Sequence, residues 1–249
     1  IVLVHDLLPL RYPQLTPLLS YHLIYVPLVV HRATKILCNS EATAKELHSR
    51  LKVPLKKIIT IPLGYNSKEL YPLKLKRKPF FLVLGRHDPH KNIVNILKAF
   101  SFFNSKEIEL FFVGPFDKRY TPGYQNLAKD LGIEKRCKWI PWVSNKERLI
   151  LLNSCLSLII ASFWEGFGLP AIEAMACETP VIASFAGALP EVIGDAGLLI
   201  NPNNQHAISD AMKNIISDSR MVENLVEKGK ERIKNCTWEK ASSIIEGVL

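Results

Sequence analysis

The chain has 249 residues, of which 48% are hydrophobic and 22% are charged, a composition that supplies a folded core and argues against a disordered or fibrous protein. Its formal net charge is +9, and residues 1–75 hold ten Lys and Arg against four Asp and Glu. We see no basic stripe interleaved with aromatic residues, so we expect no nucleic-acid partner. The basic first part is compatible with peripheral contact to an anionic membrane or with a merely solvated face.

The five cysteines are widely scattered and form no C-x-x-C pair. We therefore expect reduced, buried thiols in a cytoplasmic protein, with no disulfide framework and no metal site. The most apolar run, residues 15–30, contains His22 and Pro27 and is shorter than the ~20 residues that a membrane span needs. Because the sequence opens inside an apolar, strand-like run, we expect the first part of its N-terminal domain to lie outside it.

The first 75 residues read as part of an α/β domain. We predict strands over 1–4, 34–38 and 58–62, a loop over 7–17, and helices over 18–32 (bent at Pro27) and 41–51 (capped by Ser40). His5 follows the first strand, at the edge where open α/β sheets bind ligands. Residues 73–79 are basic and bracketed by prolines, and we interpret them as an interdomain linker.

Residues 76–249 begin a fresh alternation of strands and helices. We predict strands over 80–84, 110–113, 138–143, 156–161, 180–183 and 198–200. We predict helices over 92–103, 124–131, 144–154, 170–176, 189–193, 205–217, 220–234 and from 237 onward. Asn92 is expected to cap its helix, and Ser144 with Glu147 to form a capping box. Alternation with short links predicts parallel sheets with helices on both faces.

The stretch S-F-W-E-G-F-G-L-P-A-I-E-A-M-A at 162–176 carries the clearest chemistry. It follows a predicted strand, and Pro170 suits the first turn of the next helix. Gly166 and Gly168 let backbone approach a ligand, and a helix N-terminus favours an anion. Glu165 and Glu173 add carboxylates suited to sugar hydroxyls and a ribose diol. The alternative is an ordinary glycine turn with two solvated glutamates.

Arg86 and Lys91 lie at the same predicted edge of the sheet. Arg86 follows the strand 80–84, and Lys91 precedes the next helix. Two fixed cations here can neutralise a diphosphate and stabilise it as a leaving group. On their own they read better as two surface cations, and it is the glycine turn beside them that favours a site.

The chain resembles the family 4 glycosyltransferases of GT-B type. The resemblance rests on an ordered set of motifs: H-D-L-L-P-L at 5–10, C-N-S-E-A-T at 38–43, I-P-L-G-Y at 61–65, G-R-H-D-P-H-K-N at 85–92, F-V-G-P at 112–115, E-G-F-G-L-P-A-I-E-A-M-A at 165–176, P-V-I-A-S at 180–184 and A-L-P-E-V at 188–192. It implies two Rossmann-like domains with parallel sheets, the first incomplete. Residues 1–75 would belong to the acceptor-side domain and 76–235 to the donor-binding domain, and the helix within 236–249 would pack back toward the first.

The resemblance also implies roles for individual residues. Arg86 and Lys91 would bind the donor diphosphate, Glu165 the sugar hydroxyls, and Glu173 the ribose diol. His5 would face the sugar and phosphate across the cleft. Contacts to the sugar and the base would come from a further set: Gly166, Phe167, Gly168, Leu169, Trp139 and Val143. I-P-L-G-Y-N at 61–66 departs from the family's I-P-N-G-V-D, which puts contacts from that loop in doubt.

The resemblance implies transfer of a hexose from a nucleotide-sugar donor to a glycan or lipid-linked hydroxyl, with retention of configuration, and we expect no metal or other cofactor. The sequence contains no D-x-D pair, the usual metal-diphosphate anchor of the other large transferase fold. The motif H-D-L-L-P-L favours mannose from GDP-mannose. Alternatives are a UDP-sugar donor, or a non-catalytic protein that binds nucleotide sugars. We expect a cytoplasmic location, with peripheral contact at the inner face of the membrane as a variant of it.

Overall fold

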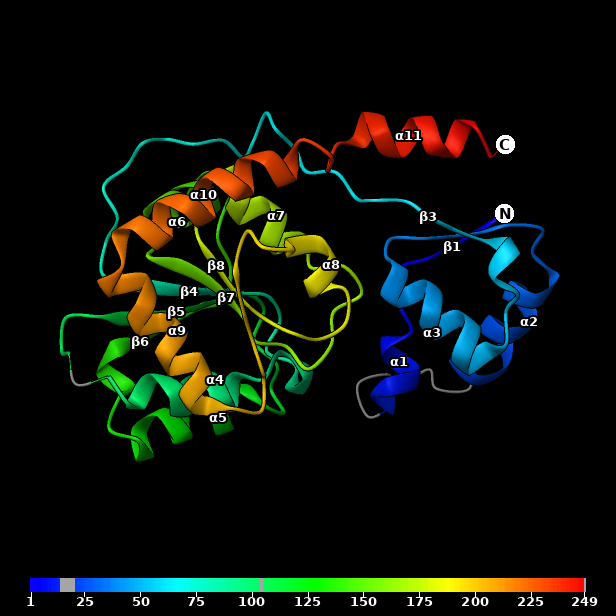
Figure 1. The fold of residues 1–249 in the computed structure, drawn as a ribbon. Coiled ribbons are helices and arrows are strands. Elements are labelled where there is room, and N and C mark those ends of the chain that lie inside the picture. Colours follow the sequence, from blue (N-terminus) through cyan, green and yellow to red (C-terminus); the bar gives the residue numbers. More distant parts are fainter. Residues whose placement is uncertain (14–20, 104, 249) are drawn as a thin grey trace.

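The computed structural model describes residues 1–13, 21–103 and 105–248, which form a small lobe and a large lobe (Figure 1). The small lobe has a parallel sheet of order β1-β2-β3, from Val2–Val4, Ile36–Cys38 and Ile58–Thr60. The large lobe has a six-stranded parallel sheet of order β6-β5-β4-β7-β8-β9. Its strands in chain order are β4 Phe80–Leu84, β5 Glu109–Val113, β6 Cys137–Ile140, β7 Ser157–Ile160, β8 Val181–Ser184 and β9 Leu198–Ile200.

Helices cover both faces of the large sheet because its strands are apolar on both sides. Phe81 and Phe112 face a core shared with α4 (Ile93–Ser101), α5 (Thr121–Asp130) and α9 (Gln205–Ser217). Their neighbours Phe80 and Leu82 face the other core. That core is closed by α6 (Asn145–Ser154), α7 (Leu169–Ala176) and α8 (Leu189–Ile193). Helix α10 (Ser219–Ile233) packs on α7 and α9. The predicted parallel α/β architecture is confirmed.

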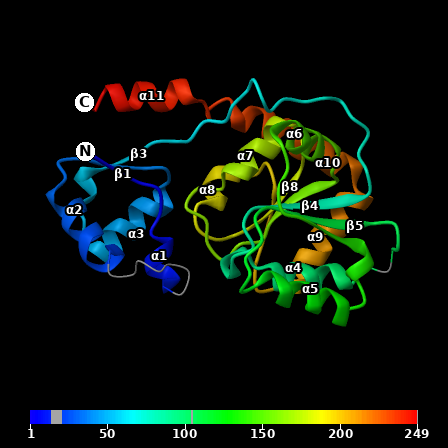
Figure 2. The same cartoon turned by 180° about the vertical axis from the view of Figure 1, so that it is seen from behind.

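The small lobe is built from α1 (Leu8–Arg11), α2 (Val26–Arg32) and α3 (Glu41–Leu51) around its sheet. Helix α11 (Trp238–Glu246) leaves the large lobe and lies along the small one (Figures 1 and 2). Its Ala241 is buried against Leu37 and Ile61. Short 3₁₀ turns complete the chain at Leu55–Lys57, Pro89–Lys91 and Glu134–Arg136.

Three local predictions need correction. The loop predicted over 7–17 contains α1, and residues 14–20 of that region lie outside the described residues. The described part of the helix predicted over 18–32 begins as a π-helical turn, Tyr21–Tyr25, and becomes α-helical at Val26. Asn92 does not cap α4 with its side chain. Its amide instead donates to the carbonyls of Ala161 (2.9 Å) and Pro202 (2.7 Å), because the residue is buried beneath the sheet edge.

Residues 73–79 lie against the large lobe. The Arg77 guanidinium donates to the carbonyls of Cys155 (2.8 Å) and Glu178 (2.6 Å). The Leu73 amide donates to the side chain of Asn153 at 2.6 Å. The chain changes lobe earlier, near Gly64, where a Cβ atom would clash with the backbone of Trp238. The outgoing and returning segments therefore touch where they cross between the lobes.

Candidate functional site

The turn between β7 and α7 forms the centre of the site. Gly168 adopts φ 96°, a left-handed conformation that glycine takes without strain, and Pro170 lies in the first turn of α7. A Cβ atom on Gly166 would lie 2.7 Å from the Cβ of Asp6 and 2.8 Å from the carbonyl oxygen of His5. The small lobe thus contacts this turn directly, at a point where only glycine leaves enough space.

Hydrogen bonds across the lobes fix the same point. The Ser40 hydroxyl donates to the carbonyl of Gly166 at 2.6 Å. The Thr43 hydroxyl lies 3.4 Å from the same Gly166 carbonyl, and 3.3 Å from the carbonyl of His5 within the small lobe. Ser40 also caps α3 by accepting the Thr43 amide, as predicted. Exposed His5 therefore lies beside the turn that carries Glu165.

Lys91 and Glu165 meet at this edge although 74 residues separate them. The Lys91 ammonium lies 2.7 Å from Glu165 Oε1, and the side chains are 20% and 13% exposed. Ser162 donates to the same oxygen at 2.6 Å. The predicted proximity of Lys91 and Glu165 is present, and Ser162 is an additional partner that sequence reasoning missed. A cation and an acceptor carboxylate thus stand side by side in a partly shielded position.

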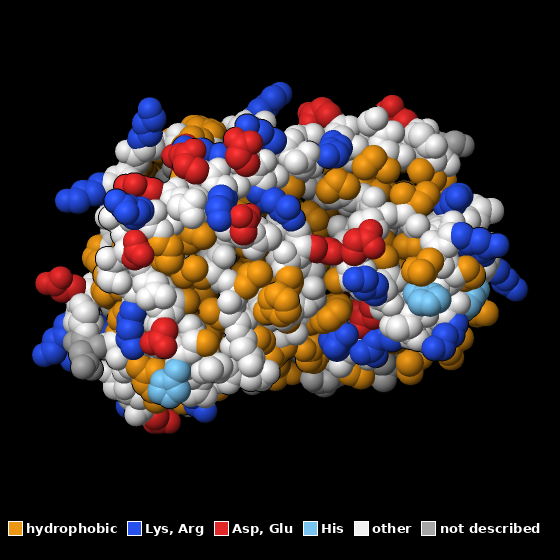
Figure 3. All heavy atoms as spheres, viewed as in Figure 1, with side chains coloured by type: hydrophobic (Ala, Val, Ile, Leu, Met, Phe, Trp, Pro, Cys, Tyr) orange, Lys and Arg blue, Asp and Glu red, His pale blue; other side chains and the backbone are white. Residues whose placement is uncertain are grey.

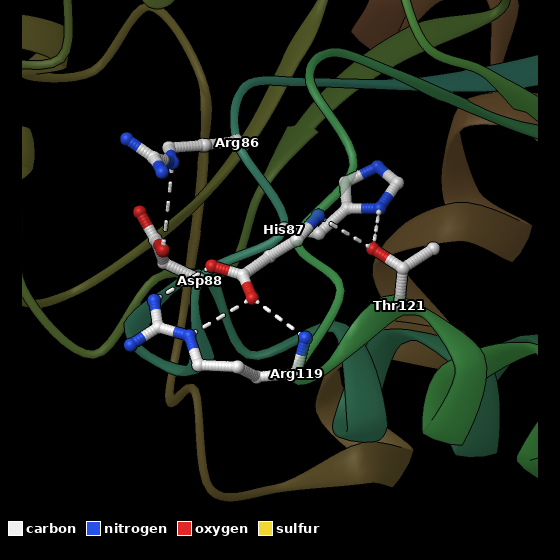
Figure 4. Close-up of polar contacts among 6 residues, drawn as sticks. Arg86, His87, Asp88, Arg119 and Thr121 are labelled. Atoms are coloured by element: carbon white, nitrogen blue, oxygen red, sulfur yellow. Dashed lines mark hydrogen bonds and ion pairs between the residues drawn. The ribbon is translucent and has the colours of Figure 1, made fainter. Parts of the chain in front are cut away.

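Arg86 projects from a well-braced loop (Figure 4). Its side chain is 62% exposed, with Nε 3.8 Å from Asp88 Oδ1. His87 anchors the loop to the start of α5, because its Nδ1 lies 3.0 Å from the Thr121 hydroxyl. Burial lowers the pKa of His87, which favours the neutral ring. Arg86 is therefore a solvent-facing cation on a fixed backbone, available to an anion.

Asp117 and Arg119 reinforce this contact between the Arg86 loop and the start of α5, which we call the brace. Arg119 donates to both carboxylate oxygens of Asp117, at 3.0 and 2.7 Å, and its backbone amide donates at 2.8 Å. These hydrogen bonds lower the pKa of Asp117 to about 2. The Asp117 amide donates to Thr121 at 2.9 Å, which links the pair to the hydroxyl bound by His87.

Glu173 lines a separate cavity of about 260 Å³ at the carboxyl ends of β4 and β5. The cavity has a largely apolar wall, and its lining includes Gly85, Gly114, Trp142, Val143 and Pro170. Arg148 donates to both oxygens of Glu173, at 3.0 and 3.3 Å. Burial raises the pKa of Glu173, and the nearby Arg148 cation opposes that rise. The expected residues Val143 and Glu173 are thus brought together, with Arg148 as a partner that no sequence signal indicated.

Trp139 does not line this cavity. Its ring stacks on Phe112, with centroids 4.3 Å apart, and meets the edge of His87. The expected contact of Trp139 with a ligand in this cavity is therefore not supported. Trp142 lines the cavity instead and is 74% exposed. Of the two residues that the resemblance implies here, Val143 lines the cavity and Trp139 does not, because alternation along β6 and the turn after it place Trp142 against the cavity.

The side chains of Phe167 and Leu169 are used in apolar packing. The Phe167 side chain is buried in an apolar cluster with Ile172 and Val192, against which Leu169 packs. The Phe167 ring and the Leu169 methyl groups hold the turn in place.

Within residues 1–13, 21–103 and 105–248, no helix has the length and apolar character needed to cross a membrane.

Comparison with known proteins identifies the family and the fold. The sequence model for glycosyl transferases group 1 matches residues 71–232. The O-antigen chain mannosyltransferase RfbU of Salmonella typhimurium strain LT2 is 31% identical over 216 residues, which are 86% of this chain and 60% of that protein. The chain thus spans about 60% of the length of this curated relative.

Solved structures share the fold. Sucrose-phosphate synthase from Thermosynechococcus elongatus superposes with a TM-score of 0.85 at 24% identity, over 99% of this chain and 66% of that one. Anabaena HepE in complex with UDP and glucose gives 0.86 at 18% identity, over 99% and 70%. The two parallel sheets are those of a GT-B fold. The chain belongs to the family of group 1 glycosyl transferases.

Proposed function

We propose that the full-length protein is a retaining glycosyltransferase that moves a hexose from a nucleotide diphosphate sugar to a hydroxyl acceptor. One observation carries the proposal. At the carboxyl edge of the large sheet, Glu165 is paired with Lys91, and Glu173 lies in an adjacent cavity. Carboxylates for sugar and ribose hydroxyls thus flank cations for a diphosphate.

In this proposal each residue has a role that follows from the chemistry of its side chain. Arg86 and Lys91 neutralise the donor diphosphate as charge develops on it. Glu165 accepts hydrogen bonds from sugar hydroxyls, and His5 faces the same sugar from the small lobe. The acceptor hydroxyl forms a bond to the anomeric carbon as the bond to the diphosphate breaks. Its proton passes to the departing phosphate. In this proposal the cations of Arg86 and Lys91 neutralise the diphosphate in place of a metal.

For the donor we propose GDP-mannose. The support is that the Salmonella relative is named a mannosyltransferase, and two further relatives carry mannosyltransferase names. A UDP-sugar donor is the second candidate, because HepE was solved with UDP and with UDP-glucose at the same fold. The acceptor we propose is a glycan or lipid-linked hydroxyl at the cytoplasmic face of a membrane. All five cysteines are buried and free, which supports a reducing location.

Contact with an anionic membrane is part of the same proposal. It is supported by the basic excess of the first 75 residues. Basic side chains are interspersed with acidic ones over the large lobe, whereas the small lobe shows mostly basic ones on the face seen in Figure 3. Any electrostatic attraction would therefore act through the small lobe.

Calorimetric titration with GDP, UDP and ADP, without metal and then with Mg²⁺, tests the donor site. We expect one nucleotide to bind more tightly than the others, with an affinity that Mg²⁺ does not change and that Arg86→Ala with Lys91→Ala abolishes. A full-length protein that binds none of the three nucleotides contradicts the proposal. Strict dependence on Mg²⁺ would contradict the metal-free part alone.

A further inference from the structure

Arg148 is unusual among the residues around Glu173 because it is a cation within a mostly apolar cavity. It lies on the first turns of α6 and lines the same cavity as Glu173. Both oxygens of Glu173 accept from one of its terminal nitrogens, Nη1. Its Nε is buried without a hydrogen-bond partner among the described residues. Within the described residues, Nη1 of the guanidinium therefore has hydrogen-bond acceptors, whereas its buried Nε has none.

The start of α6 fixes the position of Arg148. Ser144 accepts the Glu147 amide at 3.2 Å, and the Glu147 carboxylate accepts the Ser144 amide at 2.7 Å. This is the predicted capping box, and Arg148 is the next residue, with its amide bonded to the Ser144 carbonyl at 2.9 Å. Closing the first turn in this way presents the side chain to α7 and the cavity.

The surroundings of Glu173 explain why its carboxylate needs a nearby cation to stay charged. Burial is the largest influence and raises the pKa of this carboxyl, because a buried carboxylate loses hydration. The negative charge of Glu69 acts in the same direction, and Arg148 alone among the influences on Glu173 acts against both. Directly after α7, burial raises the pKa of the Cys177 thiol to about 12, so this neighbour carries no charge at neutral pH.

We propose that Arg148 is a positioning residue for nucleotide binding: it keeps Glu173 charged and aimed into the cavity, where the carboxylate accepts both hydroxyls of a ribose diol. Each carboxylate oxygen accepts more than one hydrogen bond, so the guanidinium and the diol share them. This inference rests on the proposed function and names a determinant of its donor site.

The test separates the contribution of the ribose hydroxyl from binding in general. We would measure Kd by calorimetry for GDP, UDP and ADP and for their 2′-deoxy counterparts between pH 5.5 and 8.5. The ratio of the two Kd values reports the hydrogen bond to Glu173. In the natural protein we expect a ratio of about ten or more, nearly constant over this range, because bonds to charged groups are the strong ones.

In Arg148→Leu the ratio should fall toward one as the pH decreases. Without the cation the folded-state pKa of Glu173 rises further, so the charged form and its hydrogen bonds are lost as pH falls through that value. Arg148→Lys should keep most of the ratio. Lys146→Leu removes an exposed cation from the same turn of α6 and should leave the ratio unchanged.

Two results overturn the inference while leaving the donor site standing. One is a ratio in Arg148→Leu that follows that of the natural protein at every pH. The other is an equal loss for the ribose and deoxyribose forms at every pH, which indicates general damage to the cavity. If the natural protein binds none of the nucleotides, the proposed function falls and this inference falls with it.

Discussion

Lys91 and Glu165 share a short ion pair on the turn where both lobes meet, with Ser162 on the same carboxylate oxygen. Neither charge is fully hydrated, so each depends on the other for its orientation. A bound diphosphate would share the Lys91 ammonium and leave Glu165 to the sugar hydroxyls. The pair is thus organised before a donor arrives, which lowers the ordering cost of binding.

Replacing Lys91 by Met should therefore lower kcat by 100-fold or more, since removing one preorganised donor of charge stabilisation commonly costs about 10²–10³ in rate. Steady-state transfer assays would measure it. Lys129→Met, which removes an exposed cation from α5, is the matched control and should retain full activity. A Lys91→Met enzyme within a few-fold of the natural rate would exclude the proposed role.

At the scale of elements, α6 depends on its capping box. Ser144→Ala removes the side-chain acceptor for the Glu147 amide, and we expect a loss of about 1 kcal/mol in the free energy of unfolding. Urea denaturation would measure it. Lys146→Ala, in the same turn but outside the box, should change stability by less than about 0.5 kcal/mol. Equal effects of the two changes would show that the box contributes little.

The brace between the Arg86 loop and α5 should make stability sensitive to acid. The pKa of Asp117 is about 2 in the folded protein and about 3.9 in an unfolded chain, so its contribution is present above pH 4 and lost as pH falls through 2. Asp117→Asn should lower the unfolding free energy at pH 7 and flatten its fall between pH 4 and 2. Urea titrations at several pH values would test this, and parallel curves for the two proteins would contradict it.

Local sequence signals predicted elements well and long-range partners poorly. The caps at Ser40 and Ser144 were predictable because each bonds a backbone amide three residues away. Asn92 looked like the same signal, but its amide reaches carbonyls far along the chain that no local pattern reveals.

The site follows the same rule. Strand ends placed Arg86, Lys91 and Glu165 at one edge, which topology alone guarantees in a parallel sheet. The pairing of Arg148 with Glu173, and the orientation of Trp139 into the core, depend on how α6 and β6 pack. The orientation of such side chains is determined by residues that are distant in the sequence.

For the whole molecule, Gly166 is one of the points where the small lobe and the large lobe are in close contact. A methyl group there would press on Asp6 and on the carbonyl of His5, and the bond from Ser40 would have to lengthen. Gly166→Ala should therefore cost about 1–3 kcal/mol and force the lobes apart. Thermal unfolding followed by calorimetry would show a lower Tm, and transfer activity should fall sharply. Gly123→Ala is the matched control, because a Cβ atom there meets nothing within 4 Å.

Because helix α11 is translated after the large lobe and packs on the small lobe, the small lobe cannot complete its core early in translation. Ala241 buries Leu37 and Ile61, residues made long before it. While the ribosome produces the large lobe, Leu37 in β2 and Ile61 after β3 lack their contact with Ala241 of α11 and stay exposed on that side. The small lobe therefore completes its packing only after the large lobe has been translated, and a nascent chain stalled before residue 238 would present that uncovered surface to chaperones.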